Sequence, residues 1–459
     1  MSEDMRDGTG CAEGRFGCAR PAGAGVRAGG EGVRYGLVGR VLGHSHSPAI
    51  HELLGSAPYD LIELPDEGAV RRFLAAPGAY RGLNVTIPYK KTAFACCDEL
   101  SDAARRLGNV NTIVVRPNGE LRGDNTDYHG FLRMVASCGV SPAGLTCLVL
   151  GDGGAAATAR AALEDAGAAE VLTACRRGPL TFEALAGDAE LRARVDLIAN
   201  ATPVGMYPHA DDDPLVDPGD YPNLGCVVDM VYNPLRTRLV QRARELAIPC
   251  SGGLLMLVAQ AKRASDQFLG AARPDALEDD VFERVLFSLA TVSLIGMPGC
   301  GKSTLARRLA RLCGKEAVDV DTLVVEQAGG VSIPQIMADE GEAGFRARET
   351  RATGDACGRG GRVVACGGGV VTRPENLPLL RANGPVVLLT RGLGPGETSR
   401  LATAGRPLSQ EHGVEALRQA REPLYRAWAD LEAGPREKPG DVAETIRRML
   451  PGWHTLRRH

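Results

Sequence analysis

The feature that most constrains this chain is the nine-residue stretch 296–304, with the sequence GMPGCGKST. It fits the pattern G-x-x-x-x-G-K-[ST], follows a short apolar run over 292–295 and precedes a run over 305–312 that is typical of a helix. A strand, a glycine-rich turn and a helix in that order place backbone N–H groups around phosphate at a positive helix end. The sequence therefore predicts a nucleotide phosphate site, with these binding residues: Gly299, Gly301, Lys302, Ser303 and Thr304.

Length and composition limit the classes of function. At 459 residues the chain is long enough for about three domains, and its 44% hydrophobic content is sufficient for packed cores. A net charge of -3 gives no basic stripe for nucleic acid, and no apolar run approaches the ~20 residues of a membrane span. We therefore expect a cytoplasmic protein that binds small molecules, without nucleic-acid or membrane partners and with its oligomeric state left open.

The thirteen cysteines are scattered, without paired C-x-x-C spacing. This pattern favours reduced structural thiols over a zinc site or a disulfide framework. Residues 1–32 are rich in Gly, Ala and Arg and have no hydrophobic periodicity, which predicts a disordered tail. A transit peptide is the alternative, but such peptides are poor in acids and this segment contains Glu3, Asp4, Asp7 and Glu13.

Short polar side chains follow several predicted strands in the first third of the chain. They lie in GHSHSP (43–48), GLNVTIPYKK (82–91), GNVNT (108–112) and GDNTD (123–127). Amides, hydroxyls and a carboxylate at strand ends suit a small polyhydroxylated ligand, since each ligand hydroxyl needs a partner of fixed direction. Two serines before a helix start are, taken alone, more typical of helix caps.

A second nucleotide signal begins at residue 145. The apolar run 145–150 is followed by GDGGAA (151–156) and an Ala-rich helix, a variant of the dinucleotide fingerprint that predicts contacts from Gly151, Gly153, Gly154 and Ala155. About twenty residues on, where a cofactor without a 2′-phosphate would call for an acid, the sequence reads CRR. Arg176 and Arg177 can pair with a 2′-phosphate, so NADP(H) is predicted over NAD(H).

Residues 34–270 resemble shikimate dehydrogenase, because these motifs match that family in order. The resemblance implies that Lys90 and Asp127 form the catalytic pair, in which an ammonium held beside a carboxylate supplies a proton to the forming alkoxide. It implies that the substrate carboxylate and hydroxyls are held by the following residues: Ser45, Ser47, Asn84, Thr86, Asn111, Asp127 and, across the cleft, Gln260. The family usually has Asn where this chain has Cys175. Quinate dehydrogenation and a ligand-binding module without catalysis remain alternatives for this half.

The polar motifs after the phosphate loop resemble, in series, shikimate kinase over residues 290–452. These motifs are VDVD (318–321), GEAGFRARE (341–349), VVACGGG (363–369), AGRPL (404–408) and REPLY (421–425). The resemblance implies the following roles: Asp321 at the acceptor hydroxyl, Arg346, Gly368, Gly369 and Arg421 at the shikimate ring and carboxylate, Ser303 and Asp319 at Mg²⁺, Arg406 on a lid over the phosphates, and Arg400 at the adenine. With Lys302, Asp321 and Arg406 around the transferring group, ATP and Mg²⁺ are the implied cofactors. The lid approach, 391–404, is rich in Gly, Ser and Thr.

The predicted fold class is α/β, with a two-lobed dehydrogenase that includes a Rossmann-type lobe and a P-loop domain whose parallel sheet is wrapped by helices. The expected division of the chain is a tail (1–32), a substrate-binding lobe (33–135), an NADP lobe (136–252), a closing helix (253–270), a linker (271–288), a kinase domain (289–452) and a C-terminal tail (453–459). The two implied reactions follow one another, so we expect a bifunctional enzyme that reduces 3-dehydroshikimate and then phosphorylates shikimate.

Overall fold

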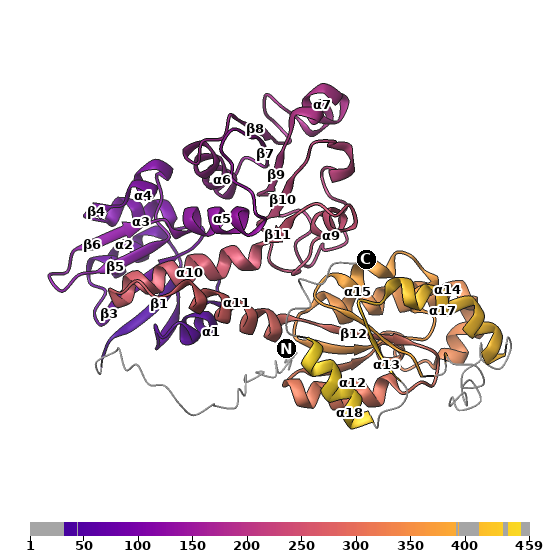
Figure 1. Cartoon of the computed structure of the whole chain (residues 1–459). Helices are drawn as coiled ribbons and strands as arrows, with labels where there is room; N and C mark the ends of the chain where they lie inside the picture. Colours follow the sequence, from indigo (N-terminus) through magenta and orange to yellow (C-terminus); the bar gives the residue numbers. More distant parts are fainter. Residues whose placement is uncertain (1–31, 44, 392, 394–412, 435–438, 451–459) are drawn as a thin grey trace, which may run out of the picture.

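The computed structural model describes residues 32–43, 45–391, 393, 413–434 and 439–450. These residues form three separate β-sheets, each covered by helices (Figure 1). The expected tails lie almost wholly outside the described residues, as do Arg400, Arg406 and nearly all of the lid approach. The two sheets of the N-terminal half form two lobes, and the third sheet forms a C-terminal domain.

The first lobe is built on a six-stranded mixed sheet with the order β2-β1-β3-β5-β6-β4. β1, β2 and β3 are parallel, while β5 runs antiparallel to both β3 and β6. Its elements are β1 (Arg34–Gly39), α1 (Ser47–Leu53), β2 (Tyr59–Glu63), α2 (Glu67–Ala75), β3 (Tyr80–Val85), α3 (Lys90–Cys96), β4 (Glu99–Leu100), α4 (Asp102–Leu107), β5 (Thr112–Val115) and β6 (Leu121–Asp124). Buried aliphatic side chains of β1 and β3 pack with α2 and α3 to form its core.

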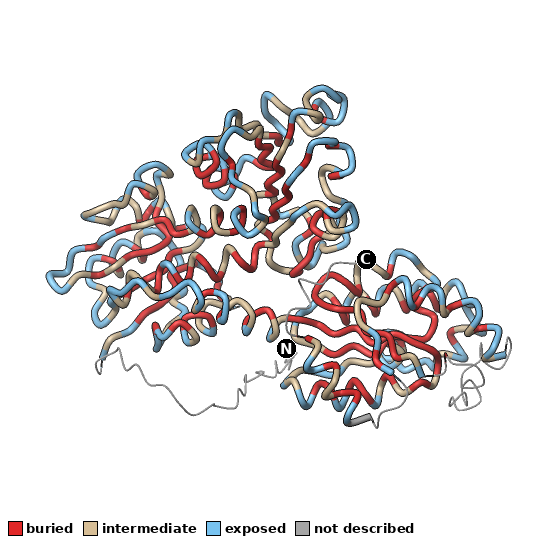
Figure 2. The backbone as a smooth tube through the Cα atoms, viewed as in Figure 1, coloured by how far each residue is buried: buried red, intermediate tan, exposed pale blue. Residues whose placement is uncertain are grey.

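The second lobe is an all-parallel five-stranded sheet with the order β11-β10-β9-β7-β8. Its central strands are buried on both faces, which explains why they read as continuous apolar runs (Figure 2). Its elements are β7 (Thr146–Leu150), α6 (Gly154–Asp165), β8 (Glu170–Ala174), α7 (Phe182–Gly187), α8 (Ala189–Arg194), β9 (Leu197–Asn200), η1 (Pro218–Asp220), β10 (Cys226–Asp229), α9 (Arg238–Glu245) and β11 (Cys250–Gly252).

Two helices connect the lobes. α5 (Thr126–Ser137) leaves the first lobe and reaches the second, and α10 (Gly253–Leu269) returns to the first lobe alongside it (Figure 1). The two helices pack closely, because an added Cβ at Gly130 of α5 would lie 2.7 Å from the carbonyl oxygen of Met256 in α10. The junction between the lobes is therefore a tight helix pair.

The segment expected as a linker is mostly helix. α11 (Asp275–Leu289) spans 15 residues and buries Val281, Val285 and Leu286 in one apolar cluster with side chains of α1 and α10. The acidic cluster of this segment also contributes to packing, since Glu278 is 3% exposed and accepts a hydrogen bond of 2.8 Å from Nε of Arg133. The expectation of a simple tether was therefore wrong: the connection is a packed helix.

The C-terminal domain is an all-parallel five-stranded sheet with the order β13-β14-β12-β15-β16, as expected for a P-loop domain. Helices lie on both faces of this sheet (Figure 1). Its elements are β12 (Val292–Gly296), α12 (Lys302–Cys313), β13 (Glu316–Asp319), α13 (Val320–Gln327), α14 (Ile333–Gly358), β14 (Arg362–Ala365), η2 (Val370–Thr372), α15 (Asn376–Arg381), β15 (Val386–Leu389), α17 (Val414–Trp428), β16 (Leu431–Ala433) and α18 (Pro439–Met449). Within α14, Gly341 has non-helical angles (φ 73°), so two helical segments meet there at a kink.

Candidate functional site

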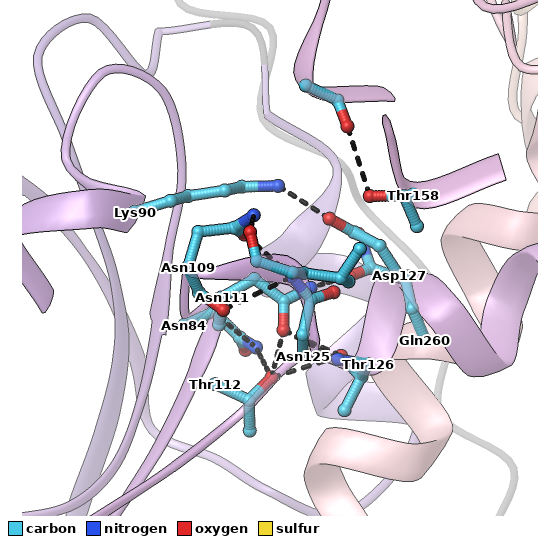
Figure 3. A network of polar contacts seen from close by, with 12 residues as sticks. Asn84, Lys90, Asn109, Asn111, Thr112, Asn125, Thr126, Asp127, Thr158 and Gln260 are labelled. Carbon is cyan, nitrogen blue, oxygen red and sulfur yellow. Dashed lines mark hydrogen bonds and ion pairs between the residues drawn. The ribbon is translucent and has the colours of Figure 1, made fainter. Parts of the chain in front are cut away.

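The predicted pair Lys90 and Asp127 forms an ion pair where the two lobes meet (Figure 3). Lys90 begins α3 after the exit of β3, and Asp127 lies in the first turn of α5, so both charges are placed at helix starts. The Lys90 Nζ is 2.5 Å from Oδ2 of Asp127, and the side chains are 26% and 18% exposed. An ammonium that is held by a carboxylate and still reached by solvent is able to donate a proton to a bound ligand.

Asn111 organises the polar groups beside this pair (Figure 3). Its Oδ1 accepts hydrogen bonds from the backbone N–H of Thr126 at 2.8 Å and from the hydroxyl of Thr112 at 2.9 Å. Its Nδ2 donates to Oε1 of Gln260 at 3.1 Å, which links the first lobe to α10. Since the Oε1 of Gln260 is the acceptor in this bond, its Nε2 remains oriented as a donor.

Asn84 is held from three sides. Its Oδ1 accepts the hydroxyl of Tyr59 at 2.8 Å, and its Nδ2 donates to Thr112 Oγ1 at 3.1 Å and to the backbone oxygen of Asn111 at 3.3 Å. The side chain is 8% exposed. A ligand hydroxyl would therefore reach the second lone pair of Oδ1, because both amide protons are already used.

Ser45, Ser47 and Thr86 follow the carboxyl ends of the neighbouring parallel strands β1 and β3. Each is half-buried, and Ser45 Oγ accepts the backbone N–H of Ser47 at 3.2 Å, although the N-cap residue of α1 is His46. Between the serines, His46 meets the Tyr232 ring edge-on with centroids 6.2 Å apart. Tyr232 follows β10 in the second lobe and was not predicted as a site residue.

The dinucleotide loop is open to solvent. Gly151 has φ +110° and directly follows β7, and an added Cβ there would lie 3.0 Å from Cγ2 of Thr202, so this position requires glycine. The next four residues are exposed at the start of α6: Asp152, Gly153, Gly154 and Ala155. Arg176 and Arg177 follow β8 and are also exposed, and within the described part of the chain neither makes a hydrogen bond or an ion pair. Two exposed guanidinium groups thus lie after the strand that neighbours β7.

A buried carboxylate supports the turns beside this loop, and sequence reasoning did not single it out. Asp229 ends β10, is fully buried and accepts hydrogen bonds from Thr237 Oγ1 (2.6 Å), Asn200 Nδ2 (2.9 Å) and the backbone N–H of Val231 (3.0 Å). Burial raises the pKa of Asp229 to about 6, against the opposing effect of these donors. Asn200 in turn accepts from the hydroxyl of Thr202 at 2.7 Å.

The phosphate loop of the C-terminal domain has the predicted strand, turn and helix. Gly296, Gly299 and Gly301 have φ values of +141°, +77° and +102°, which only glycine adopts readily. Lys302 begins α12, is 7% exposed, and its Nζ donates to the carbonyl oxygens of Gly296 (2.9 Å) and Met297 (3.0 Å). The ammonium therefore lies inside the turn that would surround a phosphate, with Ser303 half-buried beside it.

Arg346 on α14 is 6% exposed and lies under the glycine-rich turn after β14. Its Nη1 donates to Oε2 of Glu349 at 2.6 Å, and its Nη2 to Oε1 of Glu342 at 3.2 Å. Glu349 is 1% exposed, and its Oε1 has no hydrogen-bond partner among the described residues. Burial raises the pKa of Glu349, while the charge of Arg346 opposes this shift. Glu349 was not predicted; its only signal in the sequence is the three-residue spacing from Arg346.

Arg421 on α17 contacts the same turn. Its Nη1 donates to the carbonyl oxygen of Gly368 at 3.1 Å, and the hydroxyl of Tyr425 donates to that same oxygen. Gly368 and Gly369 have no room for a side chain: an added Cβ would meet Pro298 at the first and the guanidinium of Arg346 at the second. The predicted residues Arg346, Gly368, Gly369 and Arg421 are therefore gathered around one turn.

The two aspartates after β13 lie near this turn. Asp319 is the N-cap of α13, and its Oδ1 accepts the backbone N–H groups of Asp321 (3.1 Å) and Thr322 (3.3 Å). An added Cβ at Gly367 would lie 3.1 Å from Oδ1 of Asp321, which places that carboxylate beside the glycine turn. The described residues contain no group of three or more His, Cys, Asp or Glu side chains that would hold a metal ion by themselves. None of the helices in the described ranges is long and apolar enough to cross a membrane.

Comparison with known proteins gives two matches to protein families. Residues 37–113 match the substrate-binding domain of shikimate dehydrogenase, and residues 298–451 match shikimate kinase. Among curated proteins, the chain is 40% identical over 244 residues to the shikimate dehydrogenase (NADP(+)) of Acidiphilium cryptum, which covers 49% of this chain and 86% of that protein. It is 36% identical over 278 residues to the enzyme of the same name from Methanopyrus kandleri, covering 54% and 95%.

Solved structures include similar chains. One is shikimate 5-dehydrogenase from Thermus thermophilus in complex with NADP(H) and shikimate, with 32% identity, coverage of 55% of this chain and 99% of that chain, and a TM-score of 0.48. All of these dehydrogenases correspond in length to the N-terminal half of the present chain, and the kinase match begins after α11. The chain therefore belongs to the shikimate dehydrogenase family through its N-terminal half and is an enzyme that also carries a shikimate kinase domain.

Proposed function

We propose that this chain catalyses two consecutive reactions: reduction of 3-dehydroshikimate to shikimate with NADPH, and phosphorylation of shikimate at its 3-hydroxyl with Mg·ATP. One observation carries the proposal: the same chain contains two sites. The Lys90–Asp127 pair lies between two lobes, and Arg346 and Arg421 contact a glycine turn beside a phosphate loop. The product of the first reaction is the substrate of the second, so each assignment supports the other.

In the first reaction NADPH supplies a hydride to the ketone carbon when bound. The residues of the chain handle the oxygen: the Lys90 ammonium donates a proton to it as the carbon–oxygen double bond is reduced, and Asp127 keeps that ammonium oriented. Asn84, Asn111 and Gln260 present amide groups whose directions are fixed by neighbouring hydrogen bonds. Fixed donors and acceptors favour a polyhydroxylated ring in one orientation.

The serine and threonine hydroxyls complete this proposed substrate site. Ser45, Ser47 and Thr86 lie at the same sheet edge, where short hydroxyl groups suit the substrate carboxylate and ring hydroxyls. On the cofactor side, the residues present fit NADP(H), because the exposed turn after Gly151 and the exposed Arg176 and Arg177 offer backbone donors and charge for the pyrophosphate and the 2′-phosphate. The curated relatives also carry NADP(+) in their names.

In the second reaction we assign Asp321 to the acceptor hydroxyl and Lys302 to the transferring phosphoryl group. We assign Arg346 and Arg421 to the carboxylate of shikimate, because each guanidinium lies at the glycine turn and the Asp321 carboxylate lies beside Gly367 of the same turn. Phosphoryl transfer requires mainly positioning and positive charge, and this arrangement supplies both. The Lys302 ammonium would leave the carbonyl oxygens it now contacts and pair with phosphate oxygens.

The donor set also fits Mg²⁺ bound to a nucleotide. Ser303 follows Lys302 in the first turn of α12, and Asp319 uses only Oδ1 as a helix cap, which leaves its Oδ2 for a metal-bound water or the ion. Magnesium typically takes one or two protein oxygens and completes its shell with phosphate and water, so the absence of a larger acidic cluster among the described residues agrees with this assignment. The predicted roles of Arg400 and Arg406 fall outside the described residues.

One incubation tests both halves. Purified full-length protein is mixed with 3-dehydroshikimate, NADPH and Mg·ATP, NADPH absorbance is followed, and products are identified by mass spectrometry. The proposal predicts shikimate 3-phosphate with equal consumption of NADPH and ATP. Reaction that stops at shikimate would refute the kinase assignment. Unchanged NADPH with phosphorylation of added shikimate would refute the first assignment, and parallel assays with quinate would then identify a changed substrate.

A further inference from the structure

The dehydrogenase half and the kinase domain share a polar interface in addition to the connecting helix. The backbone N–H of Leu235 donates to Oδ1 of Asn383 at 3.0 Å, and that of Arg236 donates to the carbonyl oxygen of Ala382 at 2.8 Å. The Nε2 of Gln241 donates to the carbonyl oxygen of Pro378 at 3.1 Å. These bonds attach the start of α9, in the second lobe, to α15 and the turn after it in the kinase.

Asn383 is central to this interface. It is 2% exposed, and its Nδ2 donates to the carbonyl oxygens of Cys357 (2.8 Å) and Gly358 (3.1 Å) at the end of α14. All donors and the acceptor of its amide are thus fixed, with Oδ1 directed at the dehydrogenase. Arg236 is buried beside it: burial lowers the pKa of Arg236, and the charge of Asp430 in the kinase opposes this shift. A buried arginine near a carboxylate of the partner domain is typical of a specific interface.

A second contact comes from the loop after β9. An added Cβ at Gly358 would lie 3.2 Å from the ring of Tyr207, so the tyrosine packs against the end of α14. The hydroxyl of Tyr207 also raises the pKa of Arg359, the residue that follows Gly358. This loop begins at Asn200, the last residue of β9, and its Thr202 lies against Gly151 of the dinucleotide loop. The kinase therefore contacts the proposed cofactor site's own loop.

The kinase is attached to the first lobe through α11. The apolar cluster around α11 contains Ile50 on α1 and Leu54 at the end of α1, both in the first lobe. It also contains Leu235 from the second lobe. At the other end of α11, the Lys315 ammonium of the kinase donates to the carbonyl oxygens of Phe287 (2.6 Å) and Ala290 (2.8 Å). α11 is thus fixed to the first lobe at one end and to the kinase at the other, so the kinase is bound to the second lobe directly and to the first lobe through this helix (Figure 1).

A short chain of contacts leads from the interface to the dinucleotide loop. Leu235 and Arg236 are held by the kinase, and the next residue, Thr237, donates to buried Asp229 at 2.6 Å. Asp229 accepts from Asn200, Asn200 accepts from Thr202, and Thr202 packs against Gly151 at the end of β7. Each link is buried or half-buried, so a shift of the α9 start displaces the next partner in turn.

We propose that the kinase domain is a brace for the dehydrogenase: bound to both lobes, it restrains their relative movement and holds the loop over residues 200–208 in the geometry that receives NADP(H). This inference rests on the function proposed above for the first half. It makes the kinase a structural partner of the dehydrogenase site, independent of any transfer of shikimate between the two active sites.

The test uses full-length Asn383→Ala and Gln241→Ala, which remove interface hydrogen bonds without touching either proposed site. The matched control is Asn376→Ala, because Asn376 is a buried asparagine at the start of α15, the helix that precedes Asn383, and its Nδ2 donates inside the kinase to the carbonyl oxygen of Val370 at 2.8 Å. Hydrogen–deuterium exchange is measured for peptides that cover 198–208 and 227–237, and the KM for NADPH is measured in the same preparations.

We expect both interface variants to exchange faster in these two peptides and to raise the KM for NADPH by roughly 3-fold or more, while the control stays close to wild type. Wild-type exchange and KM in both interface variants would overturn the proposal, as would equal changes in Asn376→Ala. If Asn383→Ala does not fold, Gln241→Ala decides. Hydrogen–deuterium exchange can be measured whether or not the protein is active. If the wild-type protein fails to use NADPH, the proposed function is refuted, but the exchange of the interface variants still tests whether the kinase braces the dehydrogenase.

Discussion

Replacing Gly369 by alanine tests the proposed shikimate site in the kinase. The φ of Gly369 is −101°, which alanine adopts without strain, so the substitution acts only through its added methyl group. That Cβ would come within 3.0 Å of Cζ and both terminal nitrogens of Arg346. The guanidinium cannot simply rotate away, because Glu349 and Glu342 hold it and it is 6% exposed. We therefore expect Gly369→Ala to displace Arg346 from the glycine turn.

The magnitude follows from the contact that is lost. A hydrogen bond to a charged group contributes about 1.5–3 kcal/mol, so the KM for shikimate should rise by about 10-fold to 100-fold. Displacing Arg346 also leaves Glu349 buried beside a weaker partner, and disruption of a buried pair costs up to about 3–5 kcal/mol in folding stability. Release of ADP is measured with shikimate varied at saturating Mg·ATP, and thermal unfolding is followed in parallel.

The control is Gly354→Ala, which lies on the same helix as Arg346. An added Cβ at Gly354 would meet only Leu379, at 3.8 Å, so this variant changes a glycine to alanine without a collision. The KM for ATP should be unchanged in both variants, because the phosphate loop is not touched. A KM for shikimate within twofold of wild type in Gly369→Ala would refute the assignment of Arg346 to substrate binding.

Three further predictions address the dehydrogenase half. Lys90→Met should lower kcat for 3-dehydroshikimate by about 100-fold or more, since it removes the general acid. The control is Lys91→Met, because Lys91 is exposed and is the next residue of the same helix. The kinase rate of both variants should equal that of wild type. The double variant Arg176→Ala with Arg177→Ala should raise the KM for NADPH by about 10-fold or more and leave NADH use unchanged; an equal effect on both cofactors would contradict their role at the 2′-phosphate. Because the folded-state pKa of Asp229 is raised to about 6, its protonated form favours the folded state below its unfolded pKa, and this stabilisation is lost as the pH rises through 6. We therefore compare the free energy of unfolding of wild type with that of Asp229→Asn by chemical denaturation at a series of pH values. The difference, wild type minus variant, should increase by an amount on the order of 3 kcal/mol between pH 7 and pH 4. A difference that does not change with pH would contradict the raised pKa of Asp229.

Features determined by local sequence were predicted well. The strand, glycine turn and helix around Lys302 are contiguous, so their pattern alone indicated the loop that the structure contains. The contact between Lys90 and Asp127 is different in kind, because 37 residues separate them, and only the resemblance to a family suggested the pair. The parallel sheets were likewise predictable from alternating strands and helices.

The residues that were missed depend on distant partners. Glu278 reads as one of three acids on a solvated segment, yet Arg133, 145 residues away, makes it a buried residue of the packed helix α11. Glu349 and Asp229 are ordinary acids in the sequence, and only burial by the surrounding sheet gives them raised pKa values. Burial of a charge is a property of the assembled fold, and a local pattern does not encode it.

The helical connection has a consequence for the evolution and engineering of this chain. A helix turns by about 100° and advances about 1.5 Å with each residue. One residue inserted within α11 would therefore rotate the kinase domain around the helix axis relative to the dehydrogenase half. A flexible tether would accommodate the same insertion without changing the relative orientation of the two enzymes. Fusions that exchange either enzyme for a homologue should keep the helical phase between Glu278, which faces Arg133, and Ala290, whose carbonyl oxygen receives Lys315.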